Sequence, residues 1–114
     1  MSTITEIFGD PIDCYTDANA LDDGVLIDVT DLGVQFHGMP INRFTRSVWF
    51  DWRKEFQVAG QTLPKNALLH HLRAKLQAAL LSAIYQGDIW TLPERLWLIE
   101  NEVAGWTLMK PEDY

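Results

Sequence analysis

The chain has 114 residues, of which 47% are hydrophobic and 22% are charged, and its formal net charge is -7. This length suits one domain spanning residues 1–114, and the apolar content is sufficient for a core and excludes an intrinsically disordered chain. Direct binding of DNA or RNA is disfavoured, because contacts with phosphates require an excess of basic side chains.

Cys14 is the only cysteine, so an internal disulfide and a metal site built from several thiolates are both excluded. No apolar run approaches the roughly 20 residues that a membrane-spanning helix needs. Residues 1–8 also lack the basic start and the long apolar stretch of a signal peptide. We therefore expect a cytoplasmic protein that binds no membrane.

The first predicted helix begins after Thr16, a favourable N-cap residue, and ends near Gly24, which suits the left-handed conformation beyond a helix. Residues 25–29 read Val-Leu-Ile-Asp-Val and predict a short buried strand. Thr30 and Asp31 then predict one further turn.

A second predicted helix begins after Thr45, another N-cap candidate. Phe50 points away from its apolar face, so this side chain packs against a different neighbour or lies on the surface. The residues at helical spacing on the apolar face are Val48, Trp49, Trp52 and Phe56.

The longest predicted helix begins at Pro64, which suits a first helical turn, and ends at Gly87. We expect it to be central to the fold, because its apolar side chains form one continuous face. These side chains are Leu68, Leu69, Leu72, Leu76, Ala79, Leu80, Ala83 and Ile84.

Two apolar segments near the C-terminus, residues 96–99 and 106–109, flank a polar loop with a glycine and predict an antiparallel hairpin. Residues 89–92 predict one more strand. Together these elements predict an α+β fold, in which about three helices, one long and central, pack on a small, largely antiparallel sheet.

Acidic residues dominate the first third of the chain, where no basic residue precedes Arg43. Such a charge distribution attracts a basic surface by long-range steering, and it also keeps a small domain soluble. The eight acids before Arg43 are Glu6, Asp10, Asp13, Asp17, Asp22, Asp23, Asp28 and Asp31.

Residues 8–29 match the pattern F-G-x-x-I-x-x-Y-T-x-A-x-A-x-x-D-G-V-L-x-D-V. Residues 45–49 are similar to a second pattern, T-R-x-V-W. Residues 108–113 are similar to a third segment, in which a closing strand ends. In these motifs the chain resembles a family of small bacterial, plasmid and phage proteins without an assigned activity, whereas residues 57–64 match nothing in it. The resemblance implies a mobile genetic element, in which small acidic proteins often bind host machinery, and it implies no catalytic residue.

Nucleophilic and metal-binding patterns are weak. Cys14 with His37, His70 or His71 is the only combination of thiol and base, and a lone cysteine beside Tyr15 is more typical of a small buried side chain. Adjacent residues on a helix diverge by about 100°, so the two neighbouring histidines do not readily share a metal ion.

Carboxylate and nucleotide motifs are equally weak. The chain has no phosphate-binding glycine loop, no nucleophile elbow and no dinucleotide fingerprint. We therefore expect no metal, no cofactor and no enzymatic activity. The nearest candidates for Ca²⁺ or Mg²⁺ ligands are Asp22, Asp23, Asp28 and Asp31. Their spacing is not that of an EF-hand loop.

The favoured hypothesis is a protein-binding inhibitor from a mobile element. It would cover the basic surface of a host nucleic-acid-handling defence complex, as an anti-CRISPR protein does. The partner is then a host protein or nucleoprotein complex. The expected partner-binding residues are Asp10, Asp13, Asp17, Asp22, Asp23, Asp28, Asp31 and Phe50.

Two alternatives stay open. A self-associating accessory or structural module would form a homodimer by burying apolar residues such as Phe50 and Leu81 against a second copy. An enzyme of unrecognised class would use Asp23, Asp28 or His37.

Overall fold

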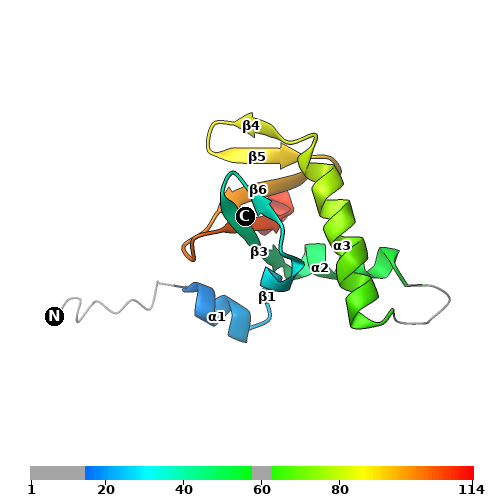
Figure 1. Ribbon diagram of the computed structural model, residues 1–114. Helices are drawn as coiled ribbons and strands as arrows, with labels where there is room; N and C mark the ends of the chain where they lie inside the picture. Colours follow the sequence, from blue (N-terminus) through cyan, green and yellow to red (C-terminus); the bar gives the residue numbers. More distant parts are fainter. Residues whose placement is uncertain (1–14, 58–62) are drawn as a thin grey trace.

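Residues 15–57 and 63–114, which the computed structural model describes, form three α-helices and one seven-stranded sheet (Figure 1). The predicted α+β class is therefore confirmed. The helices are α1 (Asp17–Asp22), α2 (Arg46–Glu55) and α3 (Lys65–Leu80). The strands are β1 (Leu26–Asp28), β2 (Gln35–Phe36), β3 (Met39–Thr45), β4 (Ile84–Gln86), β5 (Ile89–Leu92), β6 (Leu96–Glu100) and β7 (Trp106–Met109), and two 3-10 turns are η1 (Thr30–Leu32) and η2 (Pro111–Asp113).

The strand order of the sheet is β1-β3-β7-β6-β5-β4, and β2 pairs with β3. All neighbouring strands are antiparallel except β3 and β7, which run parallel. The predicted C-terminal hairpin is confirmed as β6 and β7, with Trp97 opposite Met109. The two edges of the main sheet are thus β1 and β4.

One face of the sheet points to the core and the other points away from it. Along β6, Leu96 and Leu98 are buried in the core, and the alternation of a strand turns Trp97 and Ile99 to the opposite face, which we call the second face. α2 and α3 supply the helical part of the core, through Val48, Trp52, Leu72 and Leu76.

The first predicted helix and the strand after it are confirmed, and so are the residues that mark the two ends of the helix. The Thr16 hydroxyl accepts a hydrogen bond from the backbone N–H of Asn19 at 3.1 Å, which caps α1. Gly24 follows the helix with φ of 74°, and the predicted strand at 25–29 is β1. No helix in the described part of the chain is long and apolar enough to span a membrane.

β3 is the longest of the strands that the sequence pattern does not predict. It contains Pro40 near its start and the polar pair Asn42 and Arg43 in its middle, so neither alternation nor an apolar run marks it as a strand. Yet residues 41–45 are all buried, because β3 lies between β1 and β7.

The predicted end of the long helix is wrong. α3 stops at Leu80, and Ile84, which fits the apolar helix face by spacing, lies in β4 instead. Gly87 has φ of 79° and forms a two-residue hairpin turn with Asp88, as a type II′ turn requires. The turn and the pairing with β5 override helical periodicity here.

The C-terminal turn η2 is tied to the start of α2 by Asp113. Its carboxylate accepts hydrogen bonds from the Ser47 hydroxyl at 2.6 Å, the Thr45 hydroxyl at 2.7 Å and the backbone N–H of Lys110 at 3.0 Å. Partial burial raises the pKa of Asp113, but these hydrogen bonds outweigh it and the net pKa is lowered. Thr45 thus occupies the predicted N-cap position of α2, and its hydroxyl donates to the side chain of Asp113.

Candidate functional site

A groove of about 380 Å³ lies on the second face of the sheet, between α1 and the strands β6 and β7. Leu26, Ile99 and Met109 line it with apolar side chains from three strands, and Ala20 lines it from α1. We call this hollow the α1 groove. It exists because the parallel pairing of β3 with β7 brings the N-terminal β1 region and the C-terminal hairpin onto one face.

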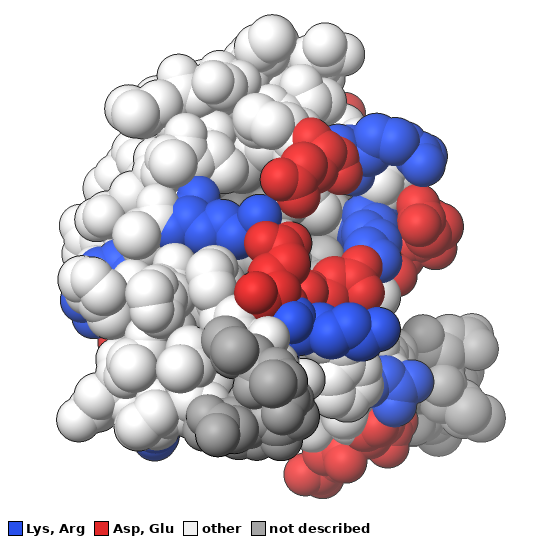
Figure 2. All heavy atoms as spheres, turned by 90° about the vertical axis from the view of Figure 1, so that its right-hand side faces the viewer, with Lys and Arg blue, Asp and Glu red and all other residues white. Residues whose placement is uncertain are grey.

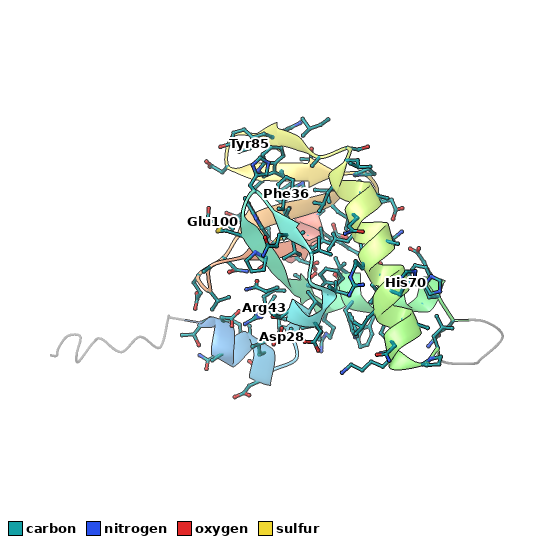
Figure 3. The ribbon with its side chains drawn as sticks, viewed as in Figure 1. Asp28, Phe36, Arg43, His70, Tyr85 and Glu100 are labelled. Atoms are coloured by element: carbon teal, nitrogen blue, oxygen red, sulfur yellow. The ribbon has the colours of Figure 1, made fainter. Side chains whose placement is uncertain are left out.

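Of the residues that the structure describes, the charged ones that line the α1 groove are all acidic: Asp17, Glu100 and Glu102. Glu100 is exposed at the end of β6 (Figure 3). Tyr15, another lining residue, donates a hydrogen bond from its hydroxyl to the Asp23 carboxylate at 2.6 Å. This bond raises the pKa of Tyr15, because it holds the proton on the phenol beside a carboxylate.

A buried ion pair attaches α1 to the sheet. Arg43 donates from Nε to Asp17 Oδ1 at 2.8 Å and from Nη2 to Asp17 Oδ2 at 2.9 Å, a bidentate geometry. The side chains of Arg43 and Asp17 are only 10% and 9% exposed. Asp28 approaches Arg43 Nη1 at 3.3 Å (Figure 3). The hydrogen bonds to Asp17 raise the pKa of Arg43, so its guanidinium stays charged.

A polar network fixes the loop that carries Glu102. Asn101 donates from Nδ2 to Asn42 Oδ1 at 2.9 Å and to the Thr107 hydroxyl at 3.1 Å. Asn101 Oδ1 accepts from the backbone N–H groups of Val103 and Gly105, at 3.0 and 3.1 Å. Glu102 in turn accepts from the backbone N–H of Asp17 at 3.0 Å, which connects the loop to α1. The groove therefore has both walls fixed by hydrogen bonds.

The structure distributes the predicted acidic residues over several environments. Asp10 and Asp13 lie outside the described residues. Asp17 lines the α1 groove and binds Arg43, and Asp28 binds Arg43 and accepts hydrogen bonds from Thr30. The Thr30 hydrogen bonds and the Arg43 charge lower the pKa of Asp28 against a smaller effect of burial.

The remaining predicted aspartates are exposed. Asp22 and Asp23 lie at the C-terminal end of α1, where Asp23 reaches the groove through Tyr15. Asp31 lies on η1, which packs against α3 and β3 rather than beside the groove. Sequence reasoning does not single out Glu100 and Glu102, because it does not predict β3, the strand that brings the end of β6 and the loop after it close to α1.

Phe50 is 53% exposed on α2 and lies apart from the α1 groove, in a hollow that it lines with Arg53, Lys54 and Gln57. Its surroundings are thus basic rather than acidic. This separates Phe50 from the aspartates with which it was grouped as a partner-binding residue.

Asp23, Asp28 and His37, the residues of the enzyme hypothesis, do not line the α1 groove together. His37 packs on Phe36 and Trp90, with ring centroids 4.3 and 4.9 Å away. Cys14 lies outside the described residues. Among residues 15–57 and 63–114, no group of three His, Cys, Asp or Glu side chains is placed to hold a metal ion.

Charges on the side of α2 and α3 are arranged differently. Figure 2 shows acidic and basic side chains interleaved on the face that it presents. Lys75 lies 3.0 Å from Glu55 and 3.3 Å from Glu94, and Lys110 binds Asp51. As far as the described residues go, the α1 side differs from this face, because its apolar hollow carries acidic charges and no basic ones on its walls.

Comparisons with protein-family models, with curated proteins and with solved structures find no match to this chain.

Proposed function

We propose that the protein is a binding protein whose α1 groove receives a basic and apolar segment of another protein. The observation that carries this proposal is the combination of an apolar floor, Leu26, Ile99 and Met109, with acidic walls. Apolar side chains of the partner would pack against this floor, and their burial would supply most of the affinity. Lys or Arg side chains would meet Glu100 and Glu102.

Charge complementarity would act mainly on specificity and on the association rate. The protein has a net charge of -7, so a basic partner is attracted from a distance and an acidic partner is repelled. Exposed ion pairs contribute less than about 1 kcal/mol each, so the acidic walls alone would not hold a partner. The apolar floor is what makes the groove more than a charged surface.

The rigid construction of the groove also supports binding. Arg43 and Asp17 fix one wall, and the Asn101 network fixes the other. A preformed site loses less conformational entropy on binding than a loop that must order itself. The groove therefore suits recognition without a conformational change.

In its finer form the proposal is that the partner belongs to a host nucleic-acid-handling complex and that binding inhibits it. The resemblance to proteins of mobile elements supports this form, and so does the charge of the groove. A nucleic-acid-binding surface is rich in Lys and Arg, and the acidic walls would compete with phosphates for it.

A peptide selection tests the proposal without knowledge of the host. A random peptide library is selected on the full chain, and the enriched peptides are sequenced and synthesised. We expect positive net charge together with apolar residues, and binding that weakens as salt concentration rises. Enrichment of acidic peptides, or of peptides whose affinity does not depend on salt concentration, would contradict the proposal.

Two variants locate the binding. Glu100→Lys should weaken binding about tenfold, since it replaces an attraction by a repulsion worth about 1.4 kcal/mol in total. Asp31→Lys is the matched control, because it changes the net charge equally on η1, away from the groove. Equal losses in both variants would show that only net charge matters, and the groove would then not be the site.

A further inference from the structure

Within residues 15–57 and 63–114, β4 is a sheet edge without the features that usually protect one. It ends the strand order, its sequence is Ile-Tyr-Gln, and all three residues are exposed. Natural edge strands are commonly shielded by lysines, prolines or covering loops, because their free backbone groups invite another strand. The opposite edge, β1, is packed by α1 and α2.

The backbone of Tyr85 faces outward at this edge. The hairpin turn of Gly87 and Asp88 makes Gln86 and Ile89 the hydrogen-bonded pair that closes the loop. Since hydrogen-bonded and non-hydrogen-bonded pairs alternate in an antiparallel ladder, the N–H and C=O of Tyr85 point away from β5. They are therefore directed to an incoming strand.

The side chains around the edge are apolar and unusually exposed. Leu81 is 89% exposed, and Ile84 and Tyr85 are each 60% exposed. Tyr85 packs against Trp90 with ring centroids 5.1 Å apart, and Trp90 packs against Phe36 at 4.9 Å. Figure 3 shows Tyr85 and Phe36 at the same end of the molecule. Aromatic clusters of this kind are typical of interface hot spots.

The charge distribution favours a second copy of the chain as the partner that pairs with β4. Residues 76–92 contain one charged residue, Asp88, in a chain whose net charge is -7. The upper part of the surface in Figure 2, toward the end where Figure 1 places β4 and β5, is largely uncharged. Two copies that meet there keep their acidic residues apart, whereas contacts through the α1 side would bring like charges together.

We propose that β4 pairs antiparallel with β4 of a second copy, about a two-fold axis at Tyr85, to form a homodimer with one continuous sheet. The two Tyr85 residues exchange backbone N–H to C=O hydrogen bonds at the axis. Ile84 of each copy then lies opposite Gln86 of the other, as an isologous interface requires. The interface leaves the α1 groove free, because α1 lies at the opposite edge of the sheet.

Sedimentation velocity over a hundredfold range of protein concentration gives the first test. We expect a dimer that dissociates on dilution, and Ile84→Lys should weaken it at least about tenfold, because it places one lysine of each copy beside the two-fold axis. Phe50→Lys is the matched control, since Phe50 is also an exposed apolar residue and lies on α2. A wild-type monomer throughout overturns the proposal, as does a dimer that Phe50→Lys weakens more than Ile84→Lys.

Disulfide trapping tests the register. In a Cys14→Ser background, Ile84→Cys and Gln86→Cys variants are oxidised with diamide, separately and mixed. Residues opposite each other at non-hydrogen-bonded positions have Cα atoms about 4.5 Å apart, which a disulfide spans. We expect disulfide-linked dimers mainly in the mixture. Equal yields in the separate samples, or none in the mixture, would contradict this pairing.

Discussion

Removal of the Asp17 carboxylate should detach α1 from the sheet and destabilise the protein by about 3 kcal/mol. Asp17→Ala removes two charge-assisted hydrogen bonds, of 2.8 and 2.9 Å, and leaves Arg43 with a side chain that is only 10% exposed. Hydrogen bonds to charged groups contribute about 1.5–3 kcal/mol each. Asp28, at 3.3 Å, and the backbone carbonyl of Asn42, at 2.8 Å, keep part of the stabilisation of Arg43.

Urea unfolding followed by tryptophan fluorescence measures this loss. Asp22→Ala is the control, because Asp22 is an exposed acid on the same helix and should change the free energy of unfolding by less than about 0.5 kcal/mol. The double variant Asp17→Ala with Arg43→Met should lose less than the sum of the single variants, since it leaves no unpaired buried charge. A loss below about 1 kcal/mol for Asp17→Ala would refute the idea that this pair holds the groove wall.

The remaining predictions concern the loop, the core and the C-terminus. Gly105→Ala should cost about 2 kcal/mol in urea unfolding, because its Cβ would lie 2.6 Å from the buried Asn42 side chain; an unchanged midpoint would contradict this. Leu72→Ala should cost about 3 kcal/mol in the same assay, whereas Leu81→Ala should stay within about 0.5 kcal/mol; similar losses would contradict the core assignment. The lowered pKa of Asp113 predicts stabilisation that is complete above the ordinary value of 3.8 and is lost as pH falls through the lower folded value. The gap between wild type and Asp113→Ala in unfolding free energy should therefore close at acidic pH, and a constant gap would contradict it.

Local chemistry made much of the fold predictable. The N-cap at Thr16 and the glycine after α1 act within a few residues, so the sequence indicates this helix without its surroundings. The β6–β7 hairpin is equally local, since two apolar segments flank a short polar loop. The α+β class follows from such elements.

Long-range pairing accounts for what the sequence did not indicate. β3 carries Asn42 and Arg43 at buried positions, and partners distant in the sequence, among them Asn101 and Asp17, make that burial favourable. The end of α3 was misplaced because Ile84 fits a helix by spacing and a strand by pairing. Tertiary contacts decided between the two.

The candidate site was predictable only in its charge. An acidic N-terminal third is visible in the sequence, but which acids line a groove depends on the parallel pairing of β3 with β7. That pairing places Glu100 and Glu102, from the far end of the chain, beside α1. It also joins Asp17 to Arg43, so this aspartate serves the wall of the groove rather than an open acidic surface.

The most direct test of the proposed binding site is a titration of the ¹⁵N-labelled protein with a selected basic and apolar peptide, followed by amide chemical shifts. The proposal predicts that the largest changes occur at Leu26, Ile99 and Met109, on the floor of the α1 groove. It also predicts that Glu100→Lys shifts the midpoint of these changes to about tenfold higher peptide concentration and that Asp31→Lys does not. Changes centred on α2, α3 or β4 instead would contradict it.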